Sequence, residues 1–134
     1  MRSHGIVCVN EIVPKLCVKG NFNRLEQVLI NLLSNSKDSI DEKPNPRLKE
    51  IRMSAEAKDG VVILSVRDSG GGIPEEVRLH LFEPFVTTKG AGHGTGLGLS
   101  ICHGIMRDFK GRIYLARTDE HGSEFHLEFP QITP

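Results

Sequence analysis

The sequence predicts a single α/β domain: a two-layer sandwich in which a mixed, mostly antiparallel β-sheet carries helices on one face. Two long segments repeat apolar residues at helical spacing, and segments with strand patterns precede, separate and follow them. Asp59-Gly60, a strong hairpin signal, joins two of the strand segments. The 134 residues suffice for one domain with a hydrophobic core, so we assign residues 1–134 to a single domain.

The first forty residues predict two strands and a helix. Strand patterns at residues 5–10 and 15–18 lie on either side of Pro14. A helix is expected from about residue 24 to residue 40, because Asn23 can cap it and the glutamate three residues later can complete a capping box. The apolar residues at helical spacing are Leu25, Val28, Leu29, Leu32, Leu33 and Ile40.

The middle of the chain predicts a hairpin and a short helix. Residues 41–47 contain two prolines and are expected to form a loop. Apolar residues alternate with polar ones from Ile51 to Glu56, which indicates a half-exposed strand, and 61–66 is the apolar return strand. Pro74 suits the first position of a helix, and two glutamates suit its first turn, so a short helix is expected to end near Leu81.

The last part of the chain predicts a long loop, a helix and a hairpin. Residues 82–94 have no clear periodicity, and Gly111 is a plausible left-handed glycine at the end of the helix that follows. Residues 112–117 and 123–129 are expected to form the final hairpin. The apolar residues of the helix are Leu97, Leu99, Ile101, Ile105, Met106 and Phe109.

Composition excludes several classes of function. Lys plus Arg equals Asp plus Glu, and a neutral chain argues against nucleic acid as the main partner. No apolar run approaches a membrane span, and no signal peptide precedes the first strand. Cys8, Cys17 and Cys102 form no C-x-x-C pair and are expected to be core residues in a reducing compartment. We therefore expect a cytoplasmic domain without direct membrane contact, whether or not its parent protein is membrane-anchored.

Four glycines alternate from Gly92 to Gly98, immediately before the second long helix. Glycine there costs helix or strand stability, so we expect it to serve a hinge or the close approach of a ligand. The following helix N-terminus favours phosphate. The Walker A loop and the dinucleotide fingerprint are both missing, so the expected phosphate site is of another type.

Three further features indicate a nucleotide site. Asn31, Asn35 and Asp38 share one helix face, which we place opposite the apolar stripe, and two amides at this spacing can offer oxygen to Mg²⁺. Asp68 ends an apolar strand before three glycines and can accept a hydrogen bond from an amino group. Lys89, after a loop that contains Phe82 and Phe85, is a natural partner for a terminal phosphate. Taken singly, each feature is more often structural.

Together these motifs resemble the ATP-binding domain of the GHKL superfamily (the Bergerat fold), and most closely that of bacterial two-component sensor histidine kinases. The resemblance covers about residues 22–130. Residues 31–36 look like the N box, 68–74 like the first glycine box, 82–85 like the F box and 92–99 like the second glycine box.

The resemblance implies roles for individual residues. Asp68 would accept the adenine amino group, Gly72 would lie close to the base, and Asn35 would coordinate Mg²⁺. Asn31 and Lys89 would act in catalysis at the phosphates, and residues 82–94 would be the ATP lid. The full set of residues expected at the nucleotide is Asn31, Asn35, Asp38, Asp68, Gly70, Gly72, Ile73, Phe85, Thr88, Lys89, Gly94, Thr95, Gly96, Leu97 and Gly98. Asp38 stands where many family members carry a basic residue.

Asn31 distinguishes the branches of this superfamily. Hydrolases carry a water-activating glutamate there, and an amide cannot act as a general base. The resemblance therefore implies transfer of the γ-phosphoryl group to a histidine rather than hydrolysis. None of the six histidines precedes Glu or Asp, so the dimerisation and phosphoacceptor domain is expected elsewhere, with a response regulator downstream. The alternatives are a GHKL ATPase, a serine-kinase-type regulator and a non-catalytic ATP-sensing module.

Overall fold

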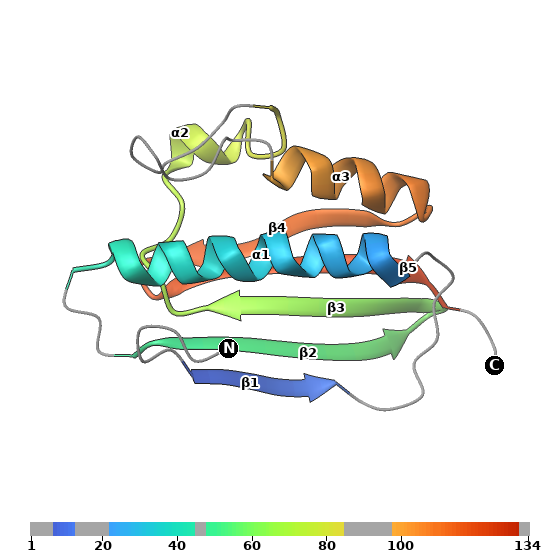
Figure 1. Ribbon diagram of the computed structural model, residues 1–134, viewed down its shortest axis with the longest axis horizontal. Coiled ribbons are helices and arrows are strands. Elements are labelled where there is room, and N and C mark those ends of the chain that lie inside the picture. The colour runs from blue at the N-terminus through green and yellow to red at the C-terminus, as the bar shows by residue number, and fades with distance from the viewer. Residues whose placement is uncertain (1–6, 13–21, 45–47, 85–97, 132–134) are drawn as a thin grey trace.

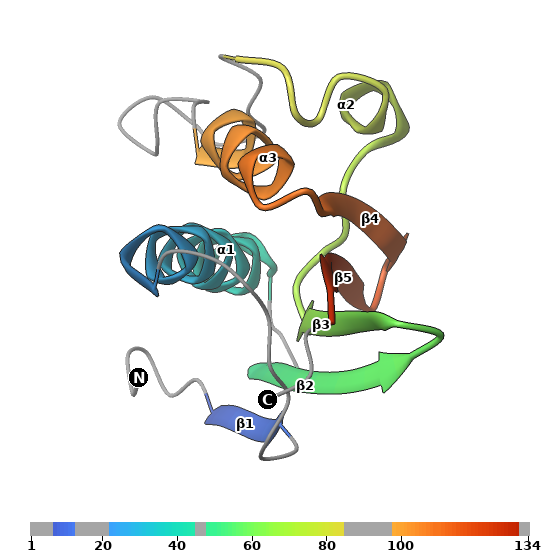
Figure 2. The same cartoon turned by 90° about the vertical axis from the view of Figure 1, so that its right-hand side faces the viewer.

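The computed structural model describes residues 7–12, 22–44, 48–84 and 98–131. Its strands form one five-stranded sheet in the order β1-β2-β3-β5-β4. Helices α1 and α3 pack against each other on one face of this sheet (Figures 1 and 2). The elements are β1 (Val7–Ile12), α1 (Phe22–Glu42), β2 (Glu50–Lys58), β3 (Val61–Asp68), α2 (Glu75–Arg78), α3 (Gly98–Asp108), β4 (Arg112–Asp119) and β5 (Gly122–Pro130). The predicted fold class is confirmed.

The sheet is mixed because β1 runs parallel to β2, with Val7 opposite Glu50. The other pairings among the described strands are antiparallel. β1 is shifted two residues along the chain from the expected strand at 5–10, and the strand expected at 15–18 lies outside the described residues. α1 connects β1 to β2 because parallel neighbours need a crossover connection.

The β2–β3 hairpin forms where the sequence predicts it. Asp59 and Gly60 both have positive φ, 52° and 79°, as a tight two-residue turn of this hand requires. The register places Ile51, Met53 and Ala55 on the helix-facing side of the sheet. The final hairpin is also confirmed, with β4 and β5 each extending slightly beyond the expected bounds.

The hydrophobic core lies between the sheet and the two helices. On α1 the deepest residues recur every four positions, at Val28, Leu32, Ser36 and Ile40. The apolar side chains that line the core from the other elements are Ile51, Ala55, Val62, Leu64, Val66, Leu81, Cys102, Ile105, Met106, Ile113, Phe125, Leu127 and Phe129. Cys102 is a free, fully buried thiol, as expected, and its burial raises its pKa to about 11.

The ends of the helices differ from the prediction. α1 begins at Phe22, so Asn23 lies inside the helix and is not its N-cap, and the helix continues two residues past Ile40. In α3 the exposed Ile101 is not a core residue, and Cys102 takes that place. α2 ends at Arg78 rather than near Leu81, and Pro74 is its N-cap rather than its first residue.

α3 ends in a motif whose left-handed residue is Lys110, with φ 61°, and not Gly111. The Gly111 N–H donates to the Met106 carbonyl and the Lys110 N–H to the Arg107 carbonyl. This is the Schellman pattern. Gly111 is needed for another reason: a Cβ there would lie 1.9 Å from the Glu128 carbonyl oxygen.

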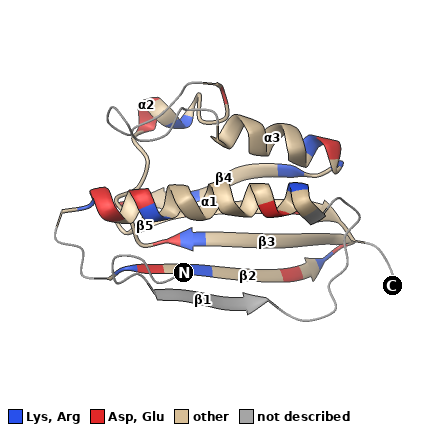
Figure 3. Ribbon diagram, in the orientation of Figure 1, with Lys and Arg blue, Asp and Glu red and all other residues tan. Residues whose placement is uncertain are grey.

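Basic and acidic residues are interspersed along the described helices and strands (Figure 3). None of the described helices combines the length and apolar character needed to cross a bilayer.

Candidate functional site

The site is built around Asp68, the last residue of β3, which is only 5% exposed. Its carboxylate accepts a hydrogen bond from the Gly70 N–H at 2.8 Å, and others from the Ser123 N–H and the Ser36 hydroxyl. Burial raises the pKa of Asp68 to about 6, although these hydrogen bonds and the charge of Lys43 oppose the rise. Asp68 is therefore a buried carboxylate that is mainly ionised at neutral pH, and in that form both of its oxygens accept hydrogen bonds.

Ser36 is a site residue that the sequence analysis did not single out. On α1 every fourth residue from Val28 to Ile40 is buried, and Ser36 is the polar member of this series. It is 3% exposed. A hydroxyl in that stripe places a donor on Asp68, which lies on the facing strand. The signal in the sequence is a serine that interrupts a regular apolar stripe, since a buried hydroxyl needs a partner.

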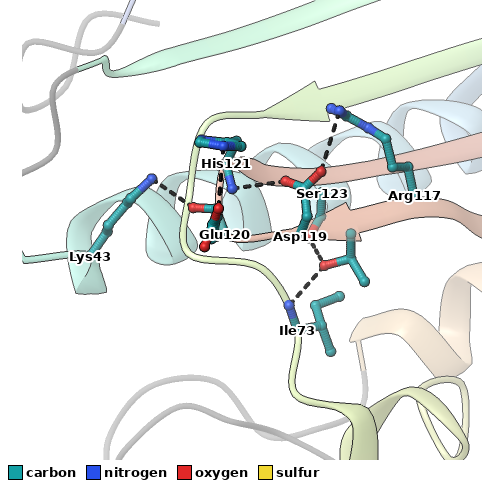
Figure 4. Close-up of polar contacts among 8 residues, drawn as sticks. Lys43, Ile73, Arg117, Asp119, Glu120, His121 and Ser123 are labelled. Atoms are coloured by element: carbon teal, nitrogen blue, oxygen red, sulfur yellow. Dashed lines mark hydrogen bonds and ion pairs between the residues drawn. The ribbon is translucent and has the colours of Figure 1, made fainter.

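The glycine loop, defined here as residues 69–73, is held at both ends. Ser69 donates from its N–H to the Glu50 carbonyl at 3.0 Å and from its hydroxyl to the Leu48 carbonyl at 2.9 Å. At the other end, the Ile73 N–H donates to the Thr118 hydroxyl at 2.8 Å (Figure 4). The loop backbone is thus fixed against β2 on one side and β4 on the other.

Two glycines of this loop are required by packing alone. A Cβ on Gly70 would lie 2.1 Å from the Ser39 hydroxyl oxygen. Gly72 has φ 82°, and a Cβ there would lie 2.3 Å from the Asp119 carbonyl oxygen. Gly71 is exposed and has open space around it. Close approach of a ligand is therefore not the sole physical reason for these glycines.

The turn between β4 and β5 supports the loop from the other side (Figure 4). The Thr118 hydroxyl lies 2.8 Å from that of Ser123, and Ser123 is 2% exposed. Gly122 must be glycine, because its φ is 138° and a Cβ would lie 1.9 Å from the Asp68 carbonyl oxygen. A cavity of about 290 Å³ opens between loop and turn, lined by Gly71, Gly72, Ile73, Pro74, Arg78, Asp119 and Glu120.

Asn31, Asn35 and Asp38 share one face of α1, as predicted, but that face does not lie opposite the buried stripe. All three residues are half-buried and lie on the flank between the buried and exposed sides. The Asn31 amide nitrogen donates to the Gly98 carbonyl at 3.4 Å and lies 3.7 Å from the Cys102 sulfur. This flank thus meets the start of α3, which brings Asn31 and Gly98 together across 67 residues of sequence.

Phe82, at the start of the expected F box, packs into the domain. Its ring stacks edge-on against Phe125, with centroids 6.4 Å apart, and lies 5.8 Å from the His103 ring. This residue therefore anchors the chain where the expected lid begins. Several expected site residues lie outside the described residues: Phe85, Thr88, Lys89, Gly94, Thr95, Gly96 and Leu97.

The described residues hold no cluster of three or more His, Cys, Asp or Glu side chains suited to a metal ion. The candidate metal ligands on α1 are amide oxygens instead. Two acceptors face the Asn31 nitrogen, so its Oδ1 is the atom directed elsewhere. Hard cations such as Mg²⁺ accept amide oxygen and keep several waters or phosphate oxygens, so this donor set fits Mg²⁺ bound together with a phosphate ligand.

Comparison with known proteins gives a consistent result. The family described as "Histidine kinase-, DNA gyrase B-, and HSP90-like ATPase" matches residues 20–133. The chain is 39% identical over 122 residues to the two-component sensor PprA of Pseudomonas aeruginosa. This match covers 90% of this chain and 13% of that protein. It is 36% identical over 114 residues to sporulation kinase A of Bacillus subtilis, and this match covers 85% of this chain and 18% of that protein. The chain therefore spans less than a fifth of either relative.

Solved structures agree with these relatives. The nucleotide-free catalytic domain of histidine kinase ThkA superposes with a TM-score of 0.77 at 36% identity, covering 94% of this chain and 79% of that one. Full-length ShkA in complex with AMPPNP superposes with a TM-score of 0.80 at 29% identity. This match covers 97% of this chain and 26% of the ShkA chain.

Proposed function

Because the chain belongs to the family of histidine kinase-, DNA gyrase B- and HSP90-like ATPases, we propose that it is a histidine kinase catalytic domain. In this proposal it binds ATP with Mg²⁺ and donates the γ-phosphoryl group to a histidine on a dimerisation domain of its parent protein. A response regulator then receives the phosphoryl group. The similarity to sensor kinases and to a histidine kinase catalytic domain supports this branch of the family.

The observation that carries the proposal is the environment of Asp68. A buried carboxylate with a pKa of about 6 lowers the stability of the fold at neutral pH, because its charged form is held away from water. Groups with pKa values perturbed in this way are typical of functional sites. Asp68 lies beside a loop whose backbone is fixed at Ser69 and Ile73, which gives it a constant position. We assign Asp68 the role of accepting the adenine amino group, with Gly72 and Ile73 near the base.

Asn35 is the residue we assign to Mg²⁺, with Asn31 beside it. When bound, the ion would neutralise charge on the phosphates as the γ-phosphoryl group is transferred. Asn31 holds the start of α3 through the Gly98 carbonyl, so it relates the metal-binding flank of α1 to the helix expected to receive the phosphates. We place Lys89, Thr88 and the glycines at 94 and 96 on the phosphates as well, from the sequence pattern.

Asn31 also favours transfer over hydrolysis. An amide cannot take a proton from water at neutral pH, so the acceptor must bring its own nucleophile. A histidine imidazole meets that requirement. The protein's part is then mainly to position the phosphoryl group and to balance its charge.

The test is phosphotransfer from ATP labelled at the γ-phosphate to a separately supplied dimerisation domain that bears the acceptor histidine. We expect label on that domain with the wild-type chain and none with Asp68→Asn, because the amide replaces one acceptor oxygen by a donor and removes the negative charge. Asn35→Ala is expected to need more Mg²⁺ for the same transfer, because one oxygen ligand is lost. Calorimetry that shows unchanged ATP affinity in Asp68→Asn would overturn the assignment of the base site.

A further inference from the structure

Lys43 follows the last residue of α1, and its ammonium contacts two backbone carbonyls from distant segments. Figure 4 shows Lys43 reaching the turn at Glu120. Nζ lies 3.0 Å from the Glu120 oxygen and 3.4 Å from the Gly70 oxygen. An ammonium has three donors, so it serves both carbonyls at once. A cation at this end of α1 also balances the partial negative charge of the helix C-terminus.

The two carbonyls belong to the two segments that form the base-recognition region. Gly70 lies in the glycine loop, and Glu120 lies in the β4–β5 turn. The glycine loop already meets the end of β4, next to this turn, through the Ile73 N–H and the Thr118 hydroxyl. Lys43 therefore joins the end of α1 to both the glycine loop and the β4–β5 turn.

Lys43, just past the end of α1, continues the spacing of two polar residues on that helix. Ser36, Ser39 and Lys43 follow at intervals of three and four residues, which places them on one face. Ser36 donates to Asp68, and the Ser39 hydroxyl leaves room only for hydrogen at Gly70. The last two turns of α1 and the residue after it thus present a polar stripe to the glycine loop, and Lys43 is the charged end of this stripe.

The charge of Lys43 also acts on Asp68. Lys43 lowers the pKa of that carboxyl against the rise caused by burial. Among the described residues of the turn, Asp119 pairs with Arg117 at 3.6 Å, and the Glu120 carboxylate lies 3.5 Å from the His121 ring. On the β2 side, Glu50 pairs with Arg52 at 3.2 Å. Among the described residues, Lys43 is the charged side chain whose field favours the ionised form of Asp68.

We propose that Lys43 is a positioning residue for base recognition, which holds the glycine loop against the β4–β5 turn and keeps Asp68 ready to accept the adenine amino group. This inference rests on the proposed function. It adds a residue outside the four sequence motifs, and it gives that residue two separable effects. The hydrogen bonds hold the loop, and the positive charge sets the pH range in which the site binds the base.

The experiment measures ADP binding by calorimetry between pH 5 and pH 8 for the wild-type chain and for Lys43→Met, Lys43→Gln and Lys43→Arg. For Lys43→Met we expect affinity at pH 7.5 to fall about fivefold or more, because two charge-assisted hydrogen bonds are lost. Its loss of affinity on acidification should begin at a higher pH than in wild type, since removing a nearby positive charge raises the pKa of a carboxyl.

The other variants separate the two effects. Lys43→Gln keeps a donor without the charge, so it should recover part of the affinity at pH 7.5 and retain the shifted pH profile. Lys43→Arg should resemble wild type both in its affinity for ADP at pH 7.5 and in the pH profile of binding. Lys58→Met is the matched control, because Lys58 is exposed at the far end of β2, and it should change neither.

The outcomes distinguish this inference from the function on which it rests. Absence of ADP binding in the wild-type chain would overturn the proposed function. Wild-type binding together with the same affinity and pH profile in Lys43→Met would overturn the role of Lys43 alone. Thermal denaturation of each variant shows whether it is folded, and if Lys43→Met does not fold, a wild-type pH profile in Lys43→Gln overturns the role equally.

Discussion

Asp68 is buried where a charged group is costly, and the surrounding donors offset that cost only in part. Its folded pKa of about 6 lies above the value of about 3.9 for an unfolded aspartate. The contribution of Asp68 to stability is therefore fully present below pH ~4 and is lost as the pH rises through about 6. Most carboxylates in folded proteins behave in the opposite way, because their partners lower the pKa.

The direction in which the stability contribution of Asp68 changes with pH can be measured. The free energy of unfolding of wild type minus that of Asp68→Asn should rise as the pH falls from 7.5 to 4.5. A shift of about two pKa units corresponds to about 3 kcal/mol at the limit. Urea denaturation at several pH values gives the difference. Asp59→Asn, in the exposed hairpin turn, is the control and should keep the wild-type pH dependence. A difference that does not vary with pH would contradict the raised pKa.

The sequence predicts the chemistry of single residues better than their surroundings. Asp68 before three glycines indicated an acceptor, and the structure adds its burial and its donors. Ser36, Ser123 and Lys43 were not predicted, because each acts on residues that are distant in the chain. Local spacing carries no information about such contacts.

At the scale of elements, local turn chemistry was predictive and helix termini were less so. Asp59-Gly60 forms the predicted tight turn. At the end of α3, however, Lys110 takes the left-handed conformation expected for Gly111. Glycine is required one residue later because β5 passes so close that a side chain does not fit. Tertiary packing, rather than helix capping, explains this glycine.

Two glycines near this helix end give opposite expectations. Gly104→Ala should stabilise the protein by about 1 kcal/mol, because it lies inside α3 with no atom within 4 Å of a new Cβ and alanine favours helix. Gly111→Ala should destabilise by about 2 kcal/mol or more, because the new Cβ would overlap the Glu128 carbonyl.

Denaturation midpoints of the two variants provide the measurement. Each variant is the control for the other, since both replace hydrogen by the same methyl group. Equal shifts of the two midpoints would contradict the packing described for Gly111.

At the scale of the whole molecule, the arrangement separates base recognition from the metal-binding flank. Asp68 and the glycine loop lie at one end of β3, whereas Asn31 meets the start of α3. α1 connects the two, because its stripe at Ser36 and Lys43 faces the loop and its flank carries the asparagines. One helix thus sets the distance between the proposed sites for the base and the metal.

The whole domain should therefore hold ATP without consuming it quickly. We expect the chain by itself to hydrolyse ATP about 10²–10⁴-fold more slowly than an enzyme with a general base in place, which is the contribution of such a base. Phosphate release assays with saturating Mg-ATP measure this, and omission of Mg²⁺ gives the background. Turnover of several per second without an acceptor domain would contradict the kinase branch and favour a hydrolase.

The sequence by itself determined the fold class, the two long helices, both antiparallel hairpins and the position of Asp68, because these depend on periodicity and turn chemistry within short segments. Tertiary structure alone decided the strand order, the parallel pairing of β1 and the polar stripe of α1 that faces the glycine loop. It also decided which glycines are required by packing. These features depend on contacts between segments far apart in the chain, and such contacts become definite only when the core is packed.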